Sequence, residues 1–328
     1  MHGRIGVHTS PRAAELAGPT ALLCAHPTPH DQVTISPPRR TMAMSGERAV
    51  PFRRRGPDEP DALIGAGGRS VVGVDGAAAS RAALAWAARR TLPQHPLHLL
   101  GVEDAVELRG VGAEHGARQL ARVLAEAAAD LLDAYPGASV TTEIEGGRVA
   151  DALVGATRPE DLLVIGSDKT GFVRGRTFGV RSLQLAAALR GALAVVPSVD
   201  LRLRTGVVVA VDGLGNAADL ALRGAQEADD RGCALTIVHA VARGGGSQRS
   251  ATGEAVVLAA RGAAVDAYPH LDVRAVVAQR HPADAILNAS RDTALLLLGS
   301  SRGETALGVG ETIHDVLMNA NAPLVILR

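Results

Sequence analysis

The stretch Val71-Val72-Gly73-Val74-Asp75-Gly76 decides the fold, because it returns 137 positions later as Val208-Val209-Ala210-Val211-Asp212-Gly213. A second stretch, Leu162-Leu163-Val164-Ile165-Gly166-Ser167, returns 133 positions later as Leu295-Leu296-Leu297-Leu298-Gly299-Ser300. Two offsets that agree so closely predict one domain present twice. In both copies a short apolar run ends in polar or glycine residues, which is typical of a buried parallel strand. Ligands of open α/β sheets bind at the carboxyl ends of such strands, so we expect the site there.

Length and composition restrict the class of protein. The chain has 328 residues, enough for two domains of ordinary size and an additional segment. Its formal net charge is zero and its aromatic content is 2%, so we predict no nucleic-acid partner and no membrane partner. Apolar runs of 18 residues are absent from the sequence, and Cys24 and Cys233 are too few for a disulfide framework or a zinc site. We expect a cytoplasmic protein with Cys233 buried and inert.

The first 66 residues differ in composition from the rest. Nine of the 17 prolines lie in residues 1–60, and the charge there is mostly arginine. Neither helical nor strand periodicity persists, so we predict a disordered tail over residues 1–66. We expect one domain over 67–198 and a second over 205–328. The start of translation stays open between Met1, Met42 and Met44.

Each copy is predicted to alternate strands with helices. In the first copy the expected strands cover 71–74, 97–102, 139–144, 162–165 and 192–196, with helices over 80–90, 114–134, 149–157 and 180–189. In the second copy the expected strands cover 207–211, 234–239, 273–278, 294–298 and 324–327, with helices over 216–231, 253–268, 283–290 and 312–319. Ser80 and Asn216 are the expected N-caps of the first helix in each copy. The alternation predicts an α/β fold of two tandem, doubly wound, parallel five-stranded sheets.

The last strand of each copy, 192–196 or 324–327, is apolar throughout. An exposed edge of that kind favours pairing with another strand. We expect the two last strands to meet about a pseudo-twofold axis, so that the duplication forms an intramolecular pseudo-dimer in place of a homodimer. A homodimer of whole chains is a second arrangement that the sequence leaves open.

These residues resemble the universal stress protein family. Val71 to Gly76, followed by Ser-Arg-Ala-Ala-Leu-Ala-Trp-Ala from Ser80, is similar to that family's first strand and helix, and Ala-Pro-Leu-Val-Ile-Leu from Ala322 is similar to its last strand. The resemblance covers residues 68–328 and implies a Rossmann-like fold of the adenine-nucleotide alpha-hydrolase-like kind. The family contains members that bind ATP and members that bind no nucleotide. Its nucleotide motif is Gly, two residues, Gly, nine residues, then Gly followed by Ser or Thr. Glycines let backbone amides approach phosphate, and the positive end of the following helix faces it.

The first copy matches this motif in part. Gly166 and Gly179 are thirteen positions apart, as the motif requires, but Lys169 replaces the middle glycine and Val180 the hydroxyl residue. Lys169 is the only lysine of the chain, and a compact ammonium group suits phosphate. The alternative is a solvated basic loop, with the aspartate bonded to local amides. The resemblance implies that nucleotide contacts in this copy come from Asp75, Gly76, Val102, Gly166, Ser167, Lys169, Gly179, Val180, Arg181 and Ser182.

The second copy departs further from the motif. Gly299 and Gly310 are only eleven positions apart, and Glu311 takes the place of the hydroxyl residue. A carboxylate at a helix N-terminus satisfies the helix dipole and repels a triphosphate, so Glu311 is interpreted as structural. The corresponding candidate contacts are Asp212, Gly299, Arg302, Gly310 and Thr312.

Two functional hypotheses follow. One is a stress-response protein that binds ATP or another adenine nucleotide weakly, with copy one as the working site. The other is a nucleotide-free regulatory or dimerisation scaffold with degenerate motifs. Neither Asp75 nor Asp212 has a carboxylate nearby in the sequence for general acid–base work, so we do not expect an enzyme. Slow ATP hydrolysis is left open.

Overall fold

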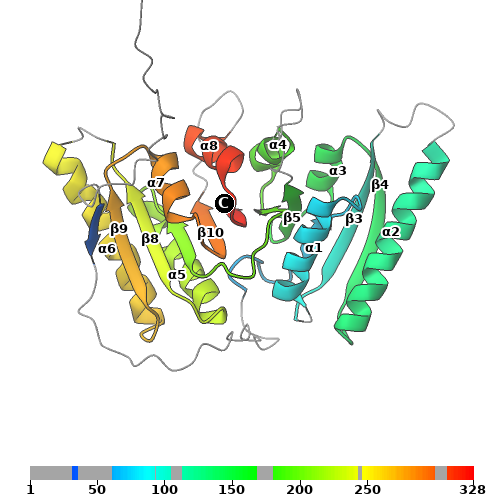
Figure 1. The fold of residues 1–328 in the computed structure, drawn as a ribbon, viewed down its shortest axis with the longest axis horizontal. Coiled ribbons are helices and arrows are strands. Elements are labelled where there is room, and N and C mark those ends of the chain that lie inside the picture. Colours follow the sequence, from blue (N-terminus) through cyan, green and yellow to red (C-terminus); the bar gives the residue numbers. More distant parts are fainter. Residues whose placement is uncertain are drawn as a thin grey trace, which may run out of the picture.

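The computed structural model describes residues 32–35, 61–92, 94–104, 113–167, 180–242, 246–299 and 309–328. Within these residues eleven strands form one sheet, in the order β1-β9-β8-β7-β10-β11-β6-β5-β2-β3-β4 (Figure 1). Two five-stranded halves therefore share one sheet, and β1 adds a strand at the outer edge of the second half.

The bounds of the elements follow the predicted alternation. The first half contains β2 (Ser70–Gly73), α1 (Ala78–Thr91), β3 (Leu97–Asp104), α2 (Ala113–Ala134), β4 (Val140–Gly147), α3 (Val149–Gly155), β5 (Leu162–Ser167), α4 (Val180–Ala188) and β6 (Ala192–Pro197). The second half contains β7 (Val207–Ala210), α5 (Leu214–Asp230), β8 (Leu235–Ala240), α6 (Gly246–Ala267), β9 (Val273–Ala278), α7 (Pro282–Ala289), β10 (Leu295–Gly299), α8 (Glu311–Asn319) and β11 (Leu324–Leu327). The predicted fold class is confirmed.

The two halves have the same topology. The order outward from the centre is β6-β5-β2-β3-β4 in one half and β11-β10-β7-β8-β9 in the other, and neighbouring strands within each half are parallel. Between the two halves the strand direction reverses, because β6 and β11 form an antiparallel pair. Consequently the strands of one half have their carboxyl ends on the side of the sheet where the strands of the other half have their amino ends.

The register of the central pair shows where the two copies are related. Ala194 pairs with Val325, and the flanking pairs are Leu324 with Val195 and Ile326 with Leu193. Exchanging the copies turns each flanking pair into the other, so a pseudo-twofold axis passes between Ala194 and Val325. The two apolar last strands thus cover each other's edges, as their sequences predict.

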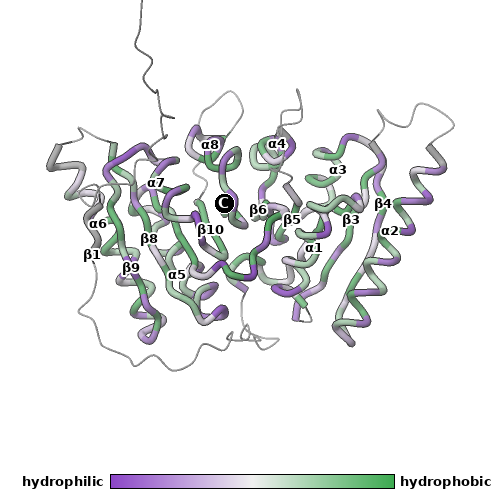
Figure 2. Tube along the Cα trace, in the orientation of Figure 1, coloured by the Kyte–Doolittle hydropathy of each residue, from purple (hydrophilic) through white to green (hydrophobic). Residues whose placement is uncertain are grey.

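Helices cover both faces of the sheet. One core contains residues of α1, α2, α5 and α6 against the sheet, and the other contains residues of α3, α4, α7 and α8. Both cores continue from one half into the other across β6 and β11. Figure 1 shows α3, α4, α7 and α8 above the strands and the other four helices on the opposite face, with α2 and α6 at the outer flanks. Figure 2 shows the apolar residues concentrated along the strands between the two layers. Trp86 of α1 belongs to the first of these cores, and only 6% of this residue is exposed.

The two predicted N-caps are wrong. Ala77 and Gly213 cap α1 and α5, and neither helix has a side-chain cap bond. Ser80 lies inside the first turn, where its hydroxyl donates to the Ala77 carbonyl at 3.1 Å and accepts from the Asp75 amide at 3.4 Å. Asn216 is likewise the third residue of its helix. Each helix begins earlier than expected because the chain turns directly after the strand.

The predicted disorder over residues 1–66 is wrong at two places. Residues Gln32–Ile35 form β1, which pairs antiparallel with β9. Ala62, Leu63 and Ile64 are 2–3% exposed and belong to the core shared by α1 and α5. Proline density concealed both, because each segment is only a few residues long and gains its stability from non-local packing. The other residues of the predicted tail lie outside the described part of the chain.

Candidate functional site

The candidate site of copy one lies at the carboxyl end of β2. In this half the chain runs from β2 to β3 and β4 on one side and returns to β5 and β6 on the other, so the topology switches between β2 and β5. Such a switch point is where open α/β sheets bind ligands. Asp75 and Gly76 follow β2, and Gly166 and Ser167 end β5, so the fold places both predicted motif segments beside the switch point.

Asp75 organises the turn from β2 into α1. Its side chain is exposed, and Oδ1 accepts a hydrogen bond from the Ala77 amide at 2.9 Å. Gly76 has a φ of 79°, which other residues rarely adopt, and its carbonyl accepts a hydrogen bond from the Arg81 guanidinium. The aspartate therefore has a local structural role while its carboxylate faces solvent at the switch point.

Gly166 is required by packing. A Cβ at this position would lie 2.7 Å from the Ser80 amide nitrogen and closer still to the Ala79 carbonyl. The end of β5 thus approaches the backbone of the first turn of α1 more closely than any side chain allows. Packing alone explains the first glycine of the motif, whether or not a phosphate binds there.

The remaining candidates of copy one are distributed around this edge. Val102, near the end of β3, and Ser167 are each partly buried. Val180 begins α4, Arg181 is exposed, and Ser182 is only 6% exposed, so its hydroxyl is poorly placed for an external ligand. Lys169 and Gly179 lie outside the described residues.

Copy two has the corresponding turn and strand end but different contacts. Asp212 is exposed after β7, and Gly299 ends β10. A Cβ at Gly299 would lie 2.7 Å from the side chains of Asn216 and Leu220 rather than from backbone. Gly310 caps α8, Glu311 is its exposed first residue, and the partly buried Thr312 follows. Arg302 lies outside the described residues. The placement of Glu311 at the positive end of α8 agrees with its interpretation as structural.

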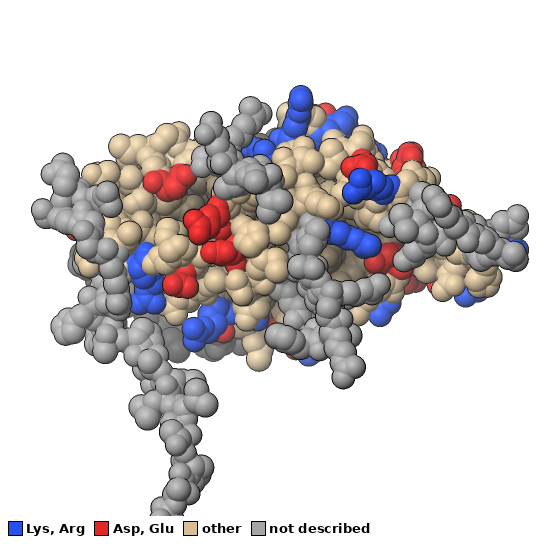
Figure 3. Space-filling view, turned by 90° about the horizontal axis from the view of Figure 1, so that it is seen from above, with Lys and Arg blue, Asp and Glu red and all other residues tan. Residues whose placement is uncertain are grey.

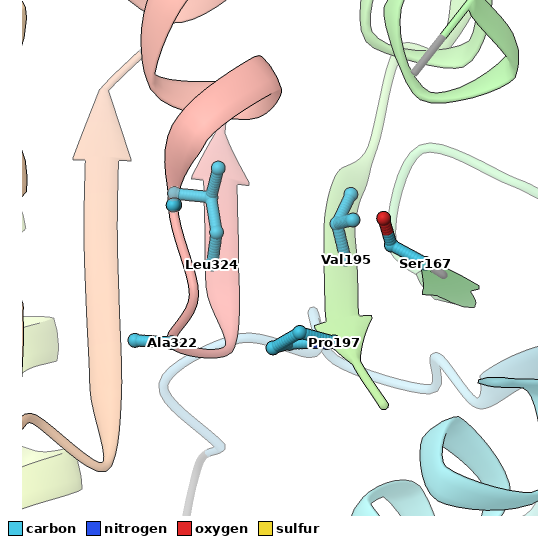
Figure 4. Close-up of a pocket in the computed structure, with 6 residues that line it drawn as sticks. Ser167, Val195, Pro197, Ala322 and Leu324 are labelled. Atoms are coloured by element: carbon cyan, nitrogen blue, oxygen red, sulfur yellow. The ribbon is translucent and has the colours of Figure 1, made fainter. Parts of the chain in front are cut away.

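A small crevice lies at the seam between the halves. Ser167, Val195 and Pro197 line it from one half, and Ala320, Ala322 and Leu324 line it from the other (Figure 4). The crevice has no room for a water-sized molecule, whereas small-molecule pockets typically have volumes of roughly 300–1,000 Å³. Its walls are apolar apart from the serine hydroxyl, so it suits close strand packing better than a charged ligand.

Charges of both signs mix on the face formed by α3, α4, α7 and α8. Figure 3 looks onto this face from above and shows basic and acidic side chains interspersed among the described residues. Within the same residues, no three His, Cys, Asp or Glu side chains are arranged to hold a metal ion. None of the described helices has the length and apolar character needed to cross a membrane.

A buried ion cluster that was not predicted from the sequence lies between the halves. The Arg90 guanidinium of α1 contacts Asp61 at 2.7 Å and Glu227 of α5 at 2.5 Å, and all three side chains are at most 3% exposed. Arg231 contacts the other oxygen of Glu227. Burial lowers the pKa of Arg90, but the charges of Asp61 and Glu227 outweigh burial and the net shift is upward. One signal was available in the sequence: Arg90 and Glu227 are 137 positions apart, which is the offset of the repeat.

Fold and site together define a tandem α/β protein with two divergent nucleotide-type motifs. The model of the universal stress protein family matches residues 68–197 and 204–328, and the chain belongs to this family. A universal stress protein of Mycolicibacterium smegmatis is 27% identical over 287 residues, covering 79% of this chain and 96% of the relative. One of Mycobacterium tuberculosis is 28% identical over 284 residues, with the same coverage. The crystal structure of a universal stress protein from Archaeoglobus fulgidus matches with a TM-score of 0.62 at 17% identity, covering 79% of this chain and 98% of that one.

Proposed function

We propose that this universal stress protein binds an adenine nucleotide weakly at copy one. The observation that carries the proposal is the exposed carboxylate of Asp75 at the switch point between β2 and β5. A carboxylate there can accept hydrogen bonds from the ribose hydroxyls or the base of a nucleotide. No comparable function is proposed for the apolar crevice at the seam.

The basic residues that follow β5 in the sequence support the same ligand. Segment 168–179 connects β5 to α4, and it contains Lys169, Arg174 and Arg176. The exposed Arg181 follows in the first turn of α4. A nucleotide that presented its ribose to Asp75 and its phosphates to this basic segment would match both ends of the site. Lysine would then replace, through charge, the amide contacts that a middle glycine provides.

Calorimetric titration of ATP, ADP and AMP tests the proposal. We expect one site per chain, weaker binding at higher salt, and about tenfold lower affinity in Lys169→Ala, the effect of one charged contact. Asp75→Asn keeps an oxygen for the Ala77 amide but loses the charge, and it should also weaken binding. The matched change in copy two, Asp212→Asn, should leave binding unchanged. No heat and no thermal stabilisation at millimolar nucleotide would refute the proposal.

The proposal is for a binding protein that acts in the cytoplasm, not for an enzyme. Phosphate release from ATP by the wild-type protein, measured beside Asp75→Asn, tests whether hydrolysis accompanies binding. We further propose that the β6–β11 seam serves within one chain as the interface that would otherwise join two chains, with no requirement for a homodimer. Light scattering should then give the mass of a single chain.

The alternative function, a nucleotide-free scaffold, has one observation in its favour. The close approach of Gly166 to Ala79 and Ser80 accounts for the first motif glycine without a ligand. In that case the two domains serve as a platform whose surfaces bind other proteins. The same titration decides between the two functions.

A further inference from the structure

The ion cluster between α1 and α5 lies on the pseudo-twofold axis. Arg90 and Glu227 are separated by the 137 positions that separate the two copies of the first strand. The helices that hold them bury equivalent positions: Ala83 corresponds to Leu220, and both are buried in the core. Arg90 and Glu227 are therefore equivalent residues of the two copies, and two equivalent residues that touch must lie about the axis that relates them.

This placement makes the contact selective. If copy one paired with another copy one about the same axis, Arg90 would meet Arg90, and a pair of second copies would bring Glu227 against Glu227. Both side chains are at most 3% exposed, so solvent would screen such like-charge contacts poorly. Arg90 contacts Asp61 and Glu227 contacts Arg231 within their own halves. Across the axis, only the pairing of copy one with copy two brings opposite charges together at this position.

Backbone pairing in the sheet does not provide this selection. Residues 192–196 and 324–327 are both apolar strands, and antiparallel hydrogen bonding between main chains is indifferent to which copy supplies the partner. The asymmetries among these paired residues are steric, since Ala194 faces Val325 on the axis and Val195 is equivalent to Ile326. Beside the ion pair, Asp61 contributes a second anion to Arg90, and its Oδ1 also accepts hydrogen bonds from Leu63 and Ile64.

We propose that the Arg90–Glu227 contact selects the partner across the seam, so that the α1 surface of copy one accepts copy two and rejects a second copy one. The partner that this surface fits is thus the other half of the same chain, or the second half of another chain in a swapped arrangement. Like-with-like dimers through this seam are excluded by charge.

Sorting of the halves after cleavage of their linker tests the proposal. A protease site replaces residues around Leu203, which is 93% exposed in the segment between β6 and β7. The cut protein is unfolded in urea, refolded, and weighed by native mass spectrometry, which distinguishes the three pairs because the halves differ in mass. We expect wild-type halves to form the mixed pair in about tenfold or greater excess over either like pair.

Matched variants separate charge from shape. Arg90→Met combined with Glu227→Met should lose the preference, whereas Arg122→Met with Glu126→Met, which removes an exposed pair on α2, should keep it. The proposal would be overturned if the wild-type halves formed like pairs as readily as mixed pairs. It would also be overturned if Arg90→Met with Glu227→Met kept the full preference for the mixed pair, and selection would then be assigned to Ala194 and Val325.

Melting of the uncut chain gives an independent measurement. Arg90→Glu and Glu227→Arg should each lower Tm. Combining them with Asp61→Asn and Arg231→Gln, which remove the like charges that would face Glu at position 90 and Arg at position 227, should recover much of the loss. A combined variant that melts no higher than the single variants contradicts selection by charge.

Discussion

Replacing Gly166 with alanine should show how tightly β5 packs on α1. The new Cβ would lie 2.7 Å from the Ser80 nitrogen and still closer to the carbonyl of Ala79. Because these are backbone atoms, no side-chain rotation relieves the overlap, and β5 and α1 must separate. Overpacking costs about 1–3 kcal/mol, and rigid neighbours place this site at the upper end, about 3 kcal/mol. For a chain of this size that corresponds to a fall in Tm of about 6–12 °C.

Thermal melts followed by circular dichroism measure this effect, with two matched controls. Gly299→Ala meets the flexible side chains of Asn216 and Leu220, so its Tm should fall less. Gly116→Ala in α2 has no atom within 4 Å and should melt slightly above the wild type, by the helix propensity of alanine. If Gly166→Ala melts within about 2 °C of the wild type, the packing explanation is refuted. Loss of nucleotide binding in that variant would then assign the glycine to phosphate.

Three further outcomes follow from single side chains. Burial, and next the charge of Arg69, lower the pKa of His98. Below about pH 6.5 the unfolded chain therefore binds more protons than the folded chain, and the stability of the wild type falls as the pH drops. Between pH 7.5 and 5.5 the Tm of His98→Gln should fall less than the Tm of the wild type. Burial raises the pKa of the Cys233 thiol, so in a Cys24→Ser background Ellman's reagent should react with the folded protein at least about tenfold more slowly than with the urea-unfolded one. Arg328 donates to two carbonyls at the end of α4, and Arg328→Ala should lower Tm by about 2–4 °C, as expected for about 1 kcal/mol; an unchanged Tm would show that this cap contributes nothing.

Most of the strands and helices could be predicted from the spacing of apolar residues along the sequence. The predicted bounds of β9 and β11 are confirmed to the residue. β11 is an uninterrupted run of branched apolar residues, and β9 alternates buried apolar residues with the exposed Arg274, both of which are typical of strands. The N-caps were wrong for a local reason: Ser80 and Asn216 are good caps by type, but the turn after each strand is too short for them to precede the helix. Residues 62–64 were missed because their burial depends on α1 and α5 meeting there.

The position of the candidate site could be predicted from the sequence, but the contacts of its residues could not. Asp75 and Gly166 were found because the repeated strands end at them, and the topology brings those ends together. The packing role of Gly166 was not predictable, since it depends on how closely α1 crosses β5. The role of Arg90 was equally hidden, because its partners Asp61 and Glu227 lie 29 and 137 positions away.

The geometry of the seam separates what can change freely in one half from what cannot. Because β6 and β11 are antiparallel, Asp75 and Asp212 follow strands that point in opposite directions, so the two candidate sites lie at opposite ends of the strands. The loops at these ends can therefore differ, as the spacing of Gly166 and Gly179 differs from that of Gly299 and Gly310. On the axis the opposite holds. A change at Arg90 alters the environment of Glu227 directly, so these two positions must be compatible in charge even though they belong to different copies. Sequence differences between the halves are thus tolerated in the loops at the candidate sites, whereas at the seam Arg90 and Glu227 must differ in the sign of their charge.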